Sequence, residues 1–299
     1  MNVHITEIQH FCTHDGPGVR TVVFMNGCPL SCKWCHNPEA RLPGNRIFFT
    51  PSACIGCGGC AARCSAHTLT EKGHLFDRSR CVRCGACTAA CPSMALENTV
   101  FTVDTSEVVE EVLKDRAFYG AKGGLTLSGG EPMQQAQAAI EMLSACRKNG
   151  LHTAVETCGY FKKDDLPALA ETADLLLWDI KDTDEARHRQ NTGVSLAPIL
   201  QNLYAADRLG IKIRLRCICL AGVNANEAHF RRVRAIAQRL DHLLGIDLLP
   251  YHPMGKSKYE RLGLPDDFDN DRYIPSKEKI EQLRGFVTQG VTFLKHENS

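Results

Sequence analysis

Three cysteines early in the chain have the spacing C-x3-C-x2-C: Cys28, Cys32 and Cys35. A [4Fe–4S] cube has four irons and normally takes four thiolates. Because no fourth cysteine stands close to these three in the sequence, they would hold a cube with one iron left open. A structural metal site is closed, whereas a catalytic site keeps a position free. The spacing therefore predicts a cluster that takes part in chemistry.

Two longer runs of cysteines follow, and both have the spacing C-x2-C-x2-C-x3-C. The first run is Cys54, Cys57, Cys60 and Cys64, and the second is Cys81, Cys84, Cys87 and Cys91. This spacing is typical of bacterial two-cluster ferredoxins, in which the fourth cysteine of each run ligates the other cluster. We therefore expect two more [4Fe–4S] clusters, with Cys91 completing the first set and Cys64 the second. Zinc is the alternative, but its C-x2-C pairs rarely repeat as two identical four-cysteine runs.

The composition excludes several other classes of protein. The chain has 299 residues with 35 Lys and Arg against 34 Asp and Glu, so its charge gives no case for binding nucleic acid or an acidic membrane. No apolar run reaches transmembrane length, and the first residues lack a signal-peptide pattern. Eleven of the sixteen cysteines stand in C-x2-C and C-x3-C spacings, which indicate metal ligation in a cytoplasmic protein rather than disulfides. Five cysteines outside the clusters are most simply small buried residues: Cys12, Cys146, Cys158, Cys217 and Cys219.

Outside the ferredoxin-like runs, predicted strands alternate with predicted helices. We expect strands near 21–25, 125–127, 152–156, 175–180, 212–220 and 247–250, and a terminal strand near 291–294. We expect helices near 107–118, 134–148, 164–171, 196–209, 227–240 and 276–288, with Ser106 capping the first and Gly150 ending the second. This alternation predicts βα units around a parallel sheet. About six units predict an open, partial (β/α)6 TIM-like barrel rather than a complete barrel of eight.

The ferredoxin-like runs interrupt this α/β pattern. They begin after the irregular stretch 41–45 and end near Asn98, where the α/β pattern resumes. We therefore expect three segments. The first part of the barrel, with the three-cysteine loop, occupies 1–46, an inserted small ferredoxin-like α+β domain occupies 47–98, and the rest of the barrel occupies 99–299.

Polar residues gather at the ends of the predicted strands, where ligand-binding loops of such barrels lie. These residues are Glu131, Glu156, Thr157, Asp179, Lys181, Arg216 and His252, with Ile180 between Asp179 and Lys181. Plain alternatives exist for each kind. A strand-end carboxylate can be a helix cap, Gly129-Gly130 can be a simple turn, and His252 can be a loop histidine.

The order of these motifs resembles radical S-adenosylmethionine (SAM) enzymes, in particular the activating enzymes of glycyl radical enzymes, relatives of pyruvate formate-lyase activating enzyme. The resemblance covers nearly the whole chain and rests on segments 14–21, 27–39, 129–132, 156–160, 179–181 and 249–252. It implies that Cys28, Cys32 and Cys35 hold a cluster whose open iron is chelated by the amino and carboxylate groups of SAM. It also implies a partner whose glycine-bearing loop meets Asp15, Gly16, Pro17 and Gly18.

The resemblance implies further roles around SAM. Gly129, Gly130 and Glu131 would face the methionyl amino group, Lys181 and His252 the carboxylate, and Arg216 the sulfonium end, with Ile180 in the same motif as Lys181. Trp34, Cys35 and His36 would line the adenosine side. Glu156, Thr157, Asp179 and the Leu177 carbonyl match a monovalent cation site of some relatives, although Glu156 stands where those relatives have aspartate.

The activity implied by the resemblance is reductive cleavage of SAM to methionine and a 5′-deoxyadenosyl radical, which removes a hydrogen atom from a glycine Cα of the partner. A donor such as flavodoxin or ferredoxin would supply the electron. The inserted clusters would relay electrons or shape the docking surface. Two alternatives stay open: a radical SAM enzyme acting on a small molecule, and a ferredoxin-type electron carrier. The insertion leans towards activators of dehydratases and of carbon–nitrogen or carbon–sulfur lyases, without naming one.

Overall fold

Six parallel strands form the centre of the molecule. The computed structural model describes residues 1–265, 268 and 271–294. In spatial order the parallel strands are β2 (Arg20–Met25), β8 (Gly124–Gly129), β9 (His152–Thr157), β10 (Leu175–Asp179), β11 (Ile213–Cys219) and β12 (Leu243–Pro250). Beyond β2, the strand β1 (Asn2–Cys12) pairs antiparallel with β2, and β7 (Phe101–Asp104) pairs antiparallel with β1. Since β12 and β7 form the two edges, the sheet is open, and the predicted partial barrel of six parallel strands is confirmed.

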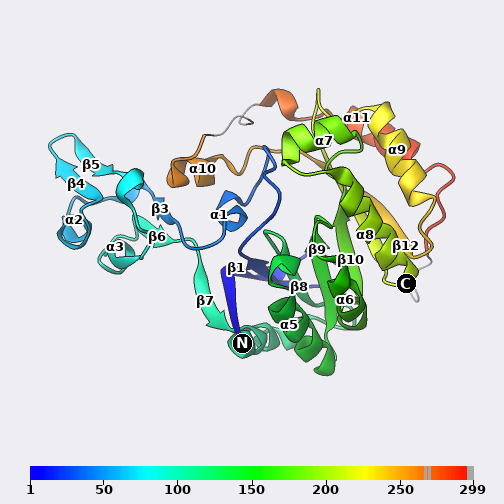
Figure 1. Ribbon diagram of the computed structural model, residues 1–299, viewed down its shortest axis with the longest axis horizontal. Helices are drawn as coiled ribbons and strands as arrows, with labels where there is room; N and C mark the ends of the chain where they lie inside the picture. The colour runs from blue at the N-terminus through cyan, green and yellow to red at the C-terminus, as the bar shows by residue number, and fades with distance from the viewer. Residues whose placement is uncertain (266–267, 269–270, 295–299) are drawn as a thin grey trace.

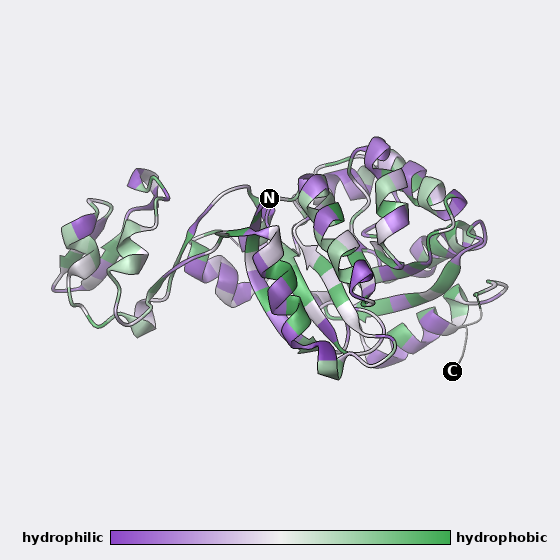
Figure 2. Cartoon of the chain, turned by 90° about the horizontal axis from the view of Figure 1, so that it is seen from below, coloured by the Kyte–Doolittle hydropathy of each residue, from purple (hydrophilic) through white to green (hydrophobic). Residues whose placement is uncertain are grey.

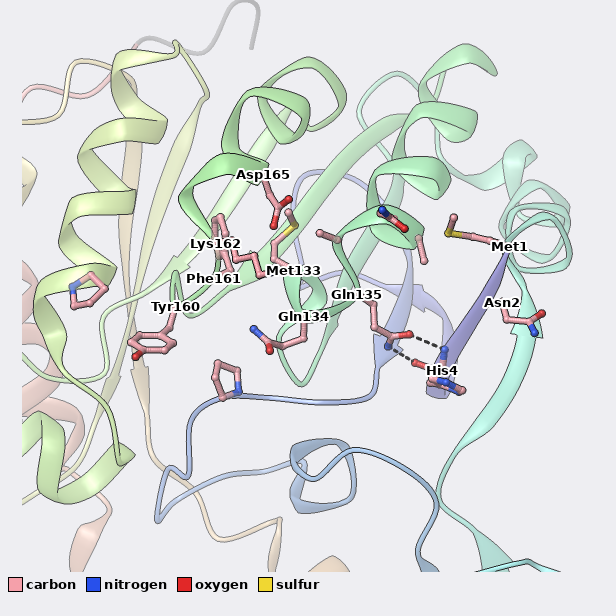
Figure 3. Close-up of a pocket in the computed structure, with 15 residues that line it drawn as sticks. Met1, Asn2, His4, Met133, Gln134, Gln135, Tyr160, Phe161, Lys162 and Asp165 are labelled. Carbon is pink, nitrogen blue, oxygen red and sulfur yellow. Dashed lines mark hydrogen bonds between the residues drawn. The ribbon is translucent and has the colours of Figure 1, made fainter.

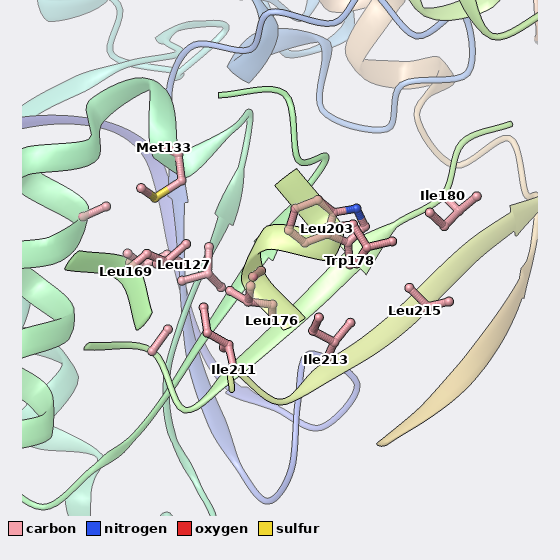
Figure 4. Close-up of a cluster of buried hydrophobic side chains, with 14 of the residues drawn as sticks. Leu127, Met133, Leu169, Leu176, Trp178, Ile180, Leu203, Ile211, Ile213 and Leu215 are labelled. Atoms are coloured by element: carbon pink, nitrogen blue, oxygen red, sulfur yellow. The ribbon is translucent and has the colours of Figure 1, made fainter. Parts of the chain in front are cut away.

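Helices connect the parallel strands and cover the outer face of the sheet (Figure 1). They are α4 (Thr105–Lys114), α5 (Ala136–Lys148), α6 (Leu166–Thr172), α7 (Glu185–Thr192), α8 (Leu196–Arg208), α9 (Glu227–Ala237) and α11 (Lys277–Val287). The main core lies between sheet and helices, and Figure 4 shows side chains of neighbouring strands within it, among them Leu127, Leu176 and Leu215. All five residues of β10 are buried, as expected for a central parallel strand covered on both faces.

Several predicted elements differ in detail from the structure. Helix α4 is shorter than expected and ends at Lys114, and its N-cap is Asp104, whose carboxylate accepts a hydrogen bond from Ser106 N. Residues 291–294 do not form a strand; one hydrogen bond, from Leu294 N to Leu243 O at 2.8 Å, joins them to β12. Gly150 follows the end of α5 with φ of +75°, which confirms its predicted position.

Several elements were not predicted, among them β1, β7 and α7. Helix α7 reads Glu-Ala-Arg-His-Arg-Gln-Asn-Thr and carries no apolar stripe, so helical periodicity does not reveal it. Asp184 caps it by accepting from Arg187 N, and Gly193 ends it with a positive φ. Its position matters because its last turn supports the three-cysteine loop described below.

Residues 47–98 lie outside the main sheet and project from one side of the barrel in both views (Figures 1 and 2). They form two antiparallel pairs, β3 (Ile47–Phe49) with β6 (Leu96–Asn98) and β4 (His67–Thr70) with β5 (Gly73–Phe76), and two short helices, α2 (Gly59–Arg63) and α3 (Ala86–Ala89). Their small buried cluster of Ile47, Cys60, Cys87 and Leu96 is separate from the main core. Arg78 links this lobe to the barrel by donating to Arg261 O at the end of α10 (Lys256–Leu262) at 2.6 Å.

No helix in the described ranges is both long and apolar enough to cross a membrane.

Candidate active site

The three-cysteine loop follows β2 and is held by backbone hydrogen bonds on two sides. Gly27 N donates to Ala40 O of α1 (Pro38–Arg41) at 2.7 Å, and Ser31 N donates to Thr192 O at the end of α7 at 2.7 Å. The loop brings the sulfur atoms of Cys28, Cys32 and Cys35 into one mostly buried cluster with Leu30 and Cys158. Burial raises the pKa of the Cys32 thiol to about 12. A thiolate there needs a compensating cation, which bound iron would supply.

Gly130 lets the turn that follows β8 lie close to this loop. A Cβ atom at Gly130 would lie 2.3 Å from Gly27 O and 2.8 Å from Ala40 O, so a larger residue would push the cysteine loop away. Gly129 is equally confined, because its φ is +106° and a Cβ atom there would lie 2.4 Å from Met25 N. The glycine pair therefore does more than make a turn, because it sets the distance between β8 and the three-cysteine loop.

Glu131 is fully buried beside the loop, and its carboxylate anchors the turn after β9. It accepts hydrogen bonds from Thr157 Oγ1 at 2.9 Å, Cys158 N at 2.8 Å and Met133 N at 3.1 Å. Burial raises the pKa of Glu131, although these donors oppose the rise. The structure thus gives Glu131 a positioning role within the protein.

Cys158 is buried, as predicted for a small apolar cysteine, but its contact with the three-cysteine loop was not predicted. Its side chain is 6% exposed and packs against Cys28 and Cys32. A hydrogen bond from the Cys158 thiol lowers the pKa of Cys28. A fourth cysteine therefore does lie near the three-cysteine loop, brought there by the turn after β9. No spacing rule reveals it, because Cys158 is far from Cys35 in the sequence and its backbone is fixed in space by Glu131.

Four charged side chains meet at the carboxyl ends of β9, β10 and β11. Lys181 Nζ lies 2.7 Å from Asp179 Oδ2, and Arg216 Nη1 lies 3.0 Å from Glu156 Oε1. Ser128 Oγ also donates to Glu156, at 2.6 Å. Burial opposes the charge of Lys181, but Asp179 raises the pKa of this amine above its usual value. Burial also opposes the charge of Glu156, but Arg216 and Ser128 hold the pKa of this carboxyl below its usual value, whereas burial raises the pKa of Asp179 although Lys181 opposes the rise.

These ion pairs bear on the expected monovalent cation. Glu156 and Asp179 each already have a cationic side chain as partner, and Thr157 Oγ1 donates to Glu131. These side-chain oxygens therefore already have partners within the protein, and a monovalent cation at these residues stays a prediction.

Trp34, His36 and His252 lie on the side of the cysteine loop that faces β12. His36 Nε2 lies 2.8 Å from His252 O, and the two imidazole rings are 4.3 Å apart. Burial lowers the pKa of His36 to about 4, so it is neutral at pH 7. Trp34 is 3% exposed and packs edge-on against Phe268. Tyr251 lies between these groups, 6.1 Å from the His36 ring and in the same buried cluster as Trp34.

The loop Asp15–Gly18 folds into the barrel from the opposite end. Thr126 Oγ1 of β8 donates to Asp15 O at 2.7 Å, and buried Arg20 donates to Thr126 Oγ1 at 2.9 Å. Asp15 Oδ1 lies 3.9 Å from Arg216 Nη1. Beside the loop is a cavity of about 770 Å³, lined also by Arg214, Arg216 and Asp247. The expected partner-contact loop therefore borders open space inside the barrel.

A second cavity, of about 830 Å³, lies outside the barrel at the start of α5 (Figure 3). Gln135 is one of its lining residues. The side-chain amide of Gln135 forms two hydrogen bonds with the backbone of His4, as the dashed lines show. Pro29 and Tyr160 are also in its lining. None of the expected SAM-binding residues lines this cavity, so its size alone does not make it the active site.

The cysteines of residues 47–98 are grouped across the two runs. One small cavity is lined by Cys54, Cys57, Cys60 and Cys91, the last of which comes from the second run. Cys87 has Cys64, Cys81 and Cys84 as charged neighbours when these are thiolates, and burial raises its pKa to about 11. The fourth cysteine of each run therefore lies with the other run.

We predict that Arg216→Met lowers the free energy of unfolding of the metal-free protein by about 3–5 kcal/mol, because it leaves Glu156 and Asp179 buried with one cation fewer. Arg214 is a matched control two residues earlier on β11. It pairs with Asp247 at 2.6 Å, but the two side chains are 34% and 30% exposed. Arg214→Met should cost about 1 kcal/mol or less. Urea unfolding measures both, and equal costs would contradict the assigned burial of the Arg216 pair.

Comparison with known proteins agrees with this site. A family model described as the radical SAM superfamily matches residues 22–233. The choline trimethylamine-lyase activating enzyme of Oleidesulfovibrio alaskensis is 42% identical over 268 residues, 87% of this chain and 86% of its own. The trans-4-hydroxy-L-proline dehydratase activating enzyme of Clostridioides difficile is 38% identical over 291 residues, 95% of each chain.

A solved structure, Streptococcus suis SuiB bound to precursor peptide SuiA, has a TM-score of 0.51 over 89% of this chain and 44% of its own, at 11% identity, and shows the fold alone. The family match and the two named relatives go further than the fold. The chain belongs to the radical SAM superfamily and, within it, to the activating enzymes of glycyl radical enzymes.

Proposed function

We propose that Cys28, Cys32 and Cys35 hold the [4Fe–4S] cluster of this activating enzyme and that SAM binds its open iron. The observation that carries this proposal is the shared buried position of the three sulfurs at the carboxyl edge of the sheet, next to Lys181. When bound, the reduced cluster supplies one electron to SAM, whose S–C5′ bond breaks to give methionine and a 5′-deoxyadenosyl radical. The donor set fits, because Cys28, Cys32 and Cys35 supply three thiolates while the nearby Cys158 donates a hydrogen bond to Cys28 instead of holding iron, which leaves one iron free for SAM.

The protein's own residues would bind and orient SAM. Lys181 suits the methionyl carboxylate because it is a buried cation on a rigid strand end, and His252 lies at the same edge. Gly129 and Gly130 offer backbone groups to the amine, whereas Trp34 and His36 offer aromatic surface to adenine. Trp34 is buried and Lys181, His36, Gly129 and Gly130 are half-buried, which supports partial exclusion of water from the radical, whereas His252 is exposed.

We propose that the substrate is a glycine-bearing loop of a partner protein, entering beside Asp15–Gly18. The support is the cavity of about 770 Å³ between this loop and Arg214, Arg216 and Asp247, which is large enough for a few residues of chain. The radical would remove one hydrogen atom from a glycine Cα, giving 5′-deoxyadenosine and a glycyl radical. The electron donor would be a flavodoxin or a ferredoxin. All sixteen cysteines are free thiols, which supports a reducing, cytoplasmic location.

We also propose that residues 47–98 are a ferredoxin-like domain inserted between barrel segments 1–46 and 99–299, with two [4Fe–4S] clusters. One would use Cys54, Cys57, Cys60 and Cys91, and the other Cys81, Cys84, Cys87 and Cys64. The grouping of Cys91 with the first run around one cavity supports this assignment. It also disfavours two local zinc sites, each of which would use the four cysteines of its own run.

The test is transfer of a radical to a partner protein. We expect that the reconstituted enzyme, SAM and dithionite produce a glycyl electron paramagnetic resonance (EPR) doublet in one of two probes, a choline trimethylamine-lyase and a trans-4-hydroxy-L-proline dehydratase. A partner in which the radical-bearing glycine is replaced by alanine is the control. One 5′-deoxyadenosine should form per radical. SAM turnover on an added small molecule, with no doublet in either protein, would instead favour the small-molecule alternative.

A further inference from the structure

Two histidines face the sulfur atoms of the first cysteine set in the inserted lobe. His74 on β5 places Nδ1 3.4 Å from Cys54 Sγ and Nε2 3.6 Å from Cys60 Sγ. His67 on β4 places its own Nδ1 3.0 Å from His74 Nε2. Residue types and spacing alone did not indicate a role for either histidine. The pairing of β4 with β5 brings them together, at positions that face the same side of the hairpin.

Aromatic packing holds both rings in place. The His67 ring stacks on Phe76 with centroids 4.4 Å apart, and the His74 ring packs edge-on against Phe49 at 4.6 Å. His67 is 4% exposed. This packing therefore fixes the His74 ring against the two sulfur atoms and the His67 ring against His74.

The contacts limit where the protons of these rings can lie. A cluster-bound thiolate can only accept hydrogen bonds, and both ring nitrogens of His74 face one, Nδ1 at Cys54 Sγ and Nε2 at Cys60 Sγ. Whichever nitrogen of His74 carries the proton, an N–H of this ring therefore faces a thiolate of the first set. His67 Nδ1 lies against Nε2 of the same ring, and Nε2 of His67 has no hydrogen-bond partner among the described residues.

The second cysteine set has different surroundings. Within the described part of the chain, hydrogen bonds to its sulfurs come from backbone N–H groups, such as that of Arg83, which donates to Cys81 Sγ at 3.4 Å. Arg46 and Arg78 act on Cys81 through charge alone. The two sets are therefore related by sequence spacing but not by environment, and an imidazole donor chain distinguishes the first from the second.

We propose that His67 and His74 form a hydrogen-bond relay to the sulfur atoms of Cys54 and Cys60 that raises the reduction potential of the first inserted cluster. This inference rests on the two inserted clusters of the proposed function. An N–H···S bond stabilises the more negative, reduced form of a cluster, so it makes reduction easier. His74 is thus a positioning and tuning residue, not a ligand, and the first cluster accepts an electron from a weaker donor than it would without the relay.

The test uses the full chain carrying Cys28→Ala, Cys32→Ala and Cys35→Ala, so that only the inserted clusters remain. We expect about eight irons per chain and two reduction potentials by EPR-monitored titration. His74→Leu should lower one potential and leave the other unchanged, with the same iron content. The expected size is about a tenfold lower ratio of reduced to oxidised cluster at a fixed solution potential, about 59 mV for one electron.

Two further variants separate tuning from packing. His74→Gln keeps a side-chain N–H and should restore part of the potential, whereas His67→Phe keeps the stacking on Phe76 and should lower the same potential less than His74→Leu does. An exchangeable proton coupled to the cluster in electron-nuclear double resonance should disappear in His74→Leu.

The outcomes that overturn the proposals differ. Eight irons with both potentials unchanged in His74→Leu would refute the relay while leaving the clusters in place. Loss of four irons in His74→Leu would refute the tuning role and make His74 a ligand or a structural support. Absence of iron in the background chain would refute the inserted clusters themselves.

Discussion

Replacing Cys32 with alanine is expected to abolish reductive cleavage of SAM, by at least about a thousand-fold, or about 4 kcal/mol of transition-state stabilisation. Cys32 is 8% exposed in the centre of the three-cysteine cluster, where burial raises the pKa of its thiol to about 12. Such a buried sulfur becomes a thiolate only when a metal compensates its charge. Two remaining cysteines would not hold a cube with one open iron, so the site for SAM would be lost.

The measurements are the iron content and 5′-deoxyadenosine formation under dithionite. Wild-type protein should bind about twelve irons and Cys32→Ala about eight, if three cubes are present. Cys146→Ala is the matched control, because Cys146 is also a fully buried cysteine but lies in the main core on α5. It should keep both the iron and the cleavage. Cleavage that survives in Cys32→Ala would contradict the assignment of the catalytic cluster.

The parts of the site that sequence could predict are those with local spacing. The cysteines at 28, 32 and 35 are joined by one loop, so their distance in sequence limits their distance in space. The order of strands and helices was also predictable, because βα alternation leaves few topologies for a parallel sheet. The structure accordingly has the expected six parallel strands.

Cys158 and the two inserted-lobe histidines show why the rest was not predictable. Cys158 reaches Cys28 only because β9 lies two strands from β2 and Glu131 fixes the turn that follows it. His67 and His74 meet through the register of a hairpin, in which His67 pairs with Phe76 and Leu69 with His74. Neither contact follows from residue type, since lone cysteines and histidines occur in many cores.

The ion pairs at the strand ends refine the functional prediction in the same way. The sequence predicts that Glu156, Asp179, Lys181 and Arg216 lie at one edge of the sheet, but it does not predict which of these side chains form ion pairs. In space they form two pairs, Lys181 with Asp179 and Arg216 with Glu156, and Lys181 remains a fixed positive charge for a carboxylate. The bound monovalent cation stays a prediction. The chemistry of a site therefore depends on which partner each charge already has.

The second large effect is expected at Gly159, which closes the turn that carries Thr157 and Cys158. Gly159 has φ of +77°, and a Cβ atom there would lie 2.2 Å from Cζ2 of the fully buried Trp178. Gly159→Ala should therefore combine the cost of a left-handed conformation, about 1–2 kcal/mol, with that of overpacking, about 1–3 kcal/mol. We expect a loss of about 2–5 kcal/mol in the free energy of unfolding.

Gly44 separates these two causes. It has φ of +81° but no atom within 4 Å of a Cβ position, so Gly44→Ala should cost only the conformational part, about 1–2 kcal/mol. Urea unfolding of the metal-free proteins measures both changes. Because Trp178 would have to move with the turn, Gly159→Ala should also weaken SAM binding, whereas Gly44→Ala should not. If Gly159→Ala and Gly44→Ala lowered the free energy of unfolding equally, the turn at Gly159 would adjust without displacing Trp178. The close packing of Gly159 on Trp178 would then not be what holds Cys158 against Cys28.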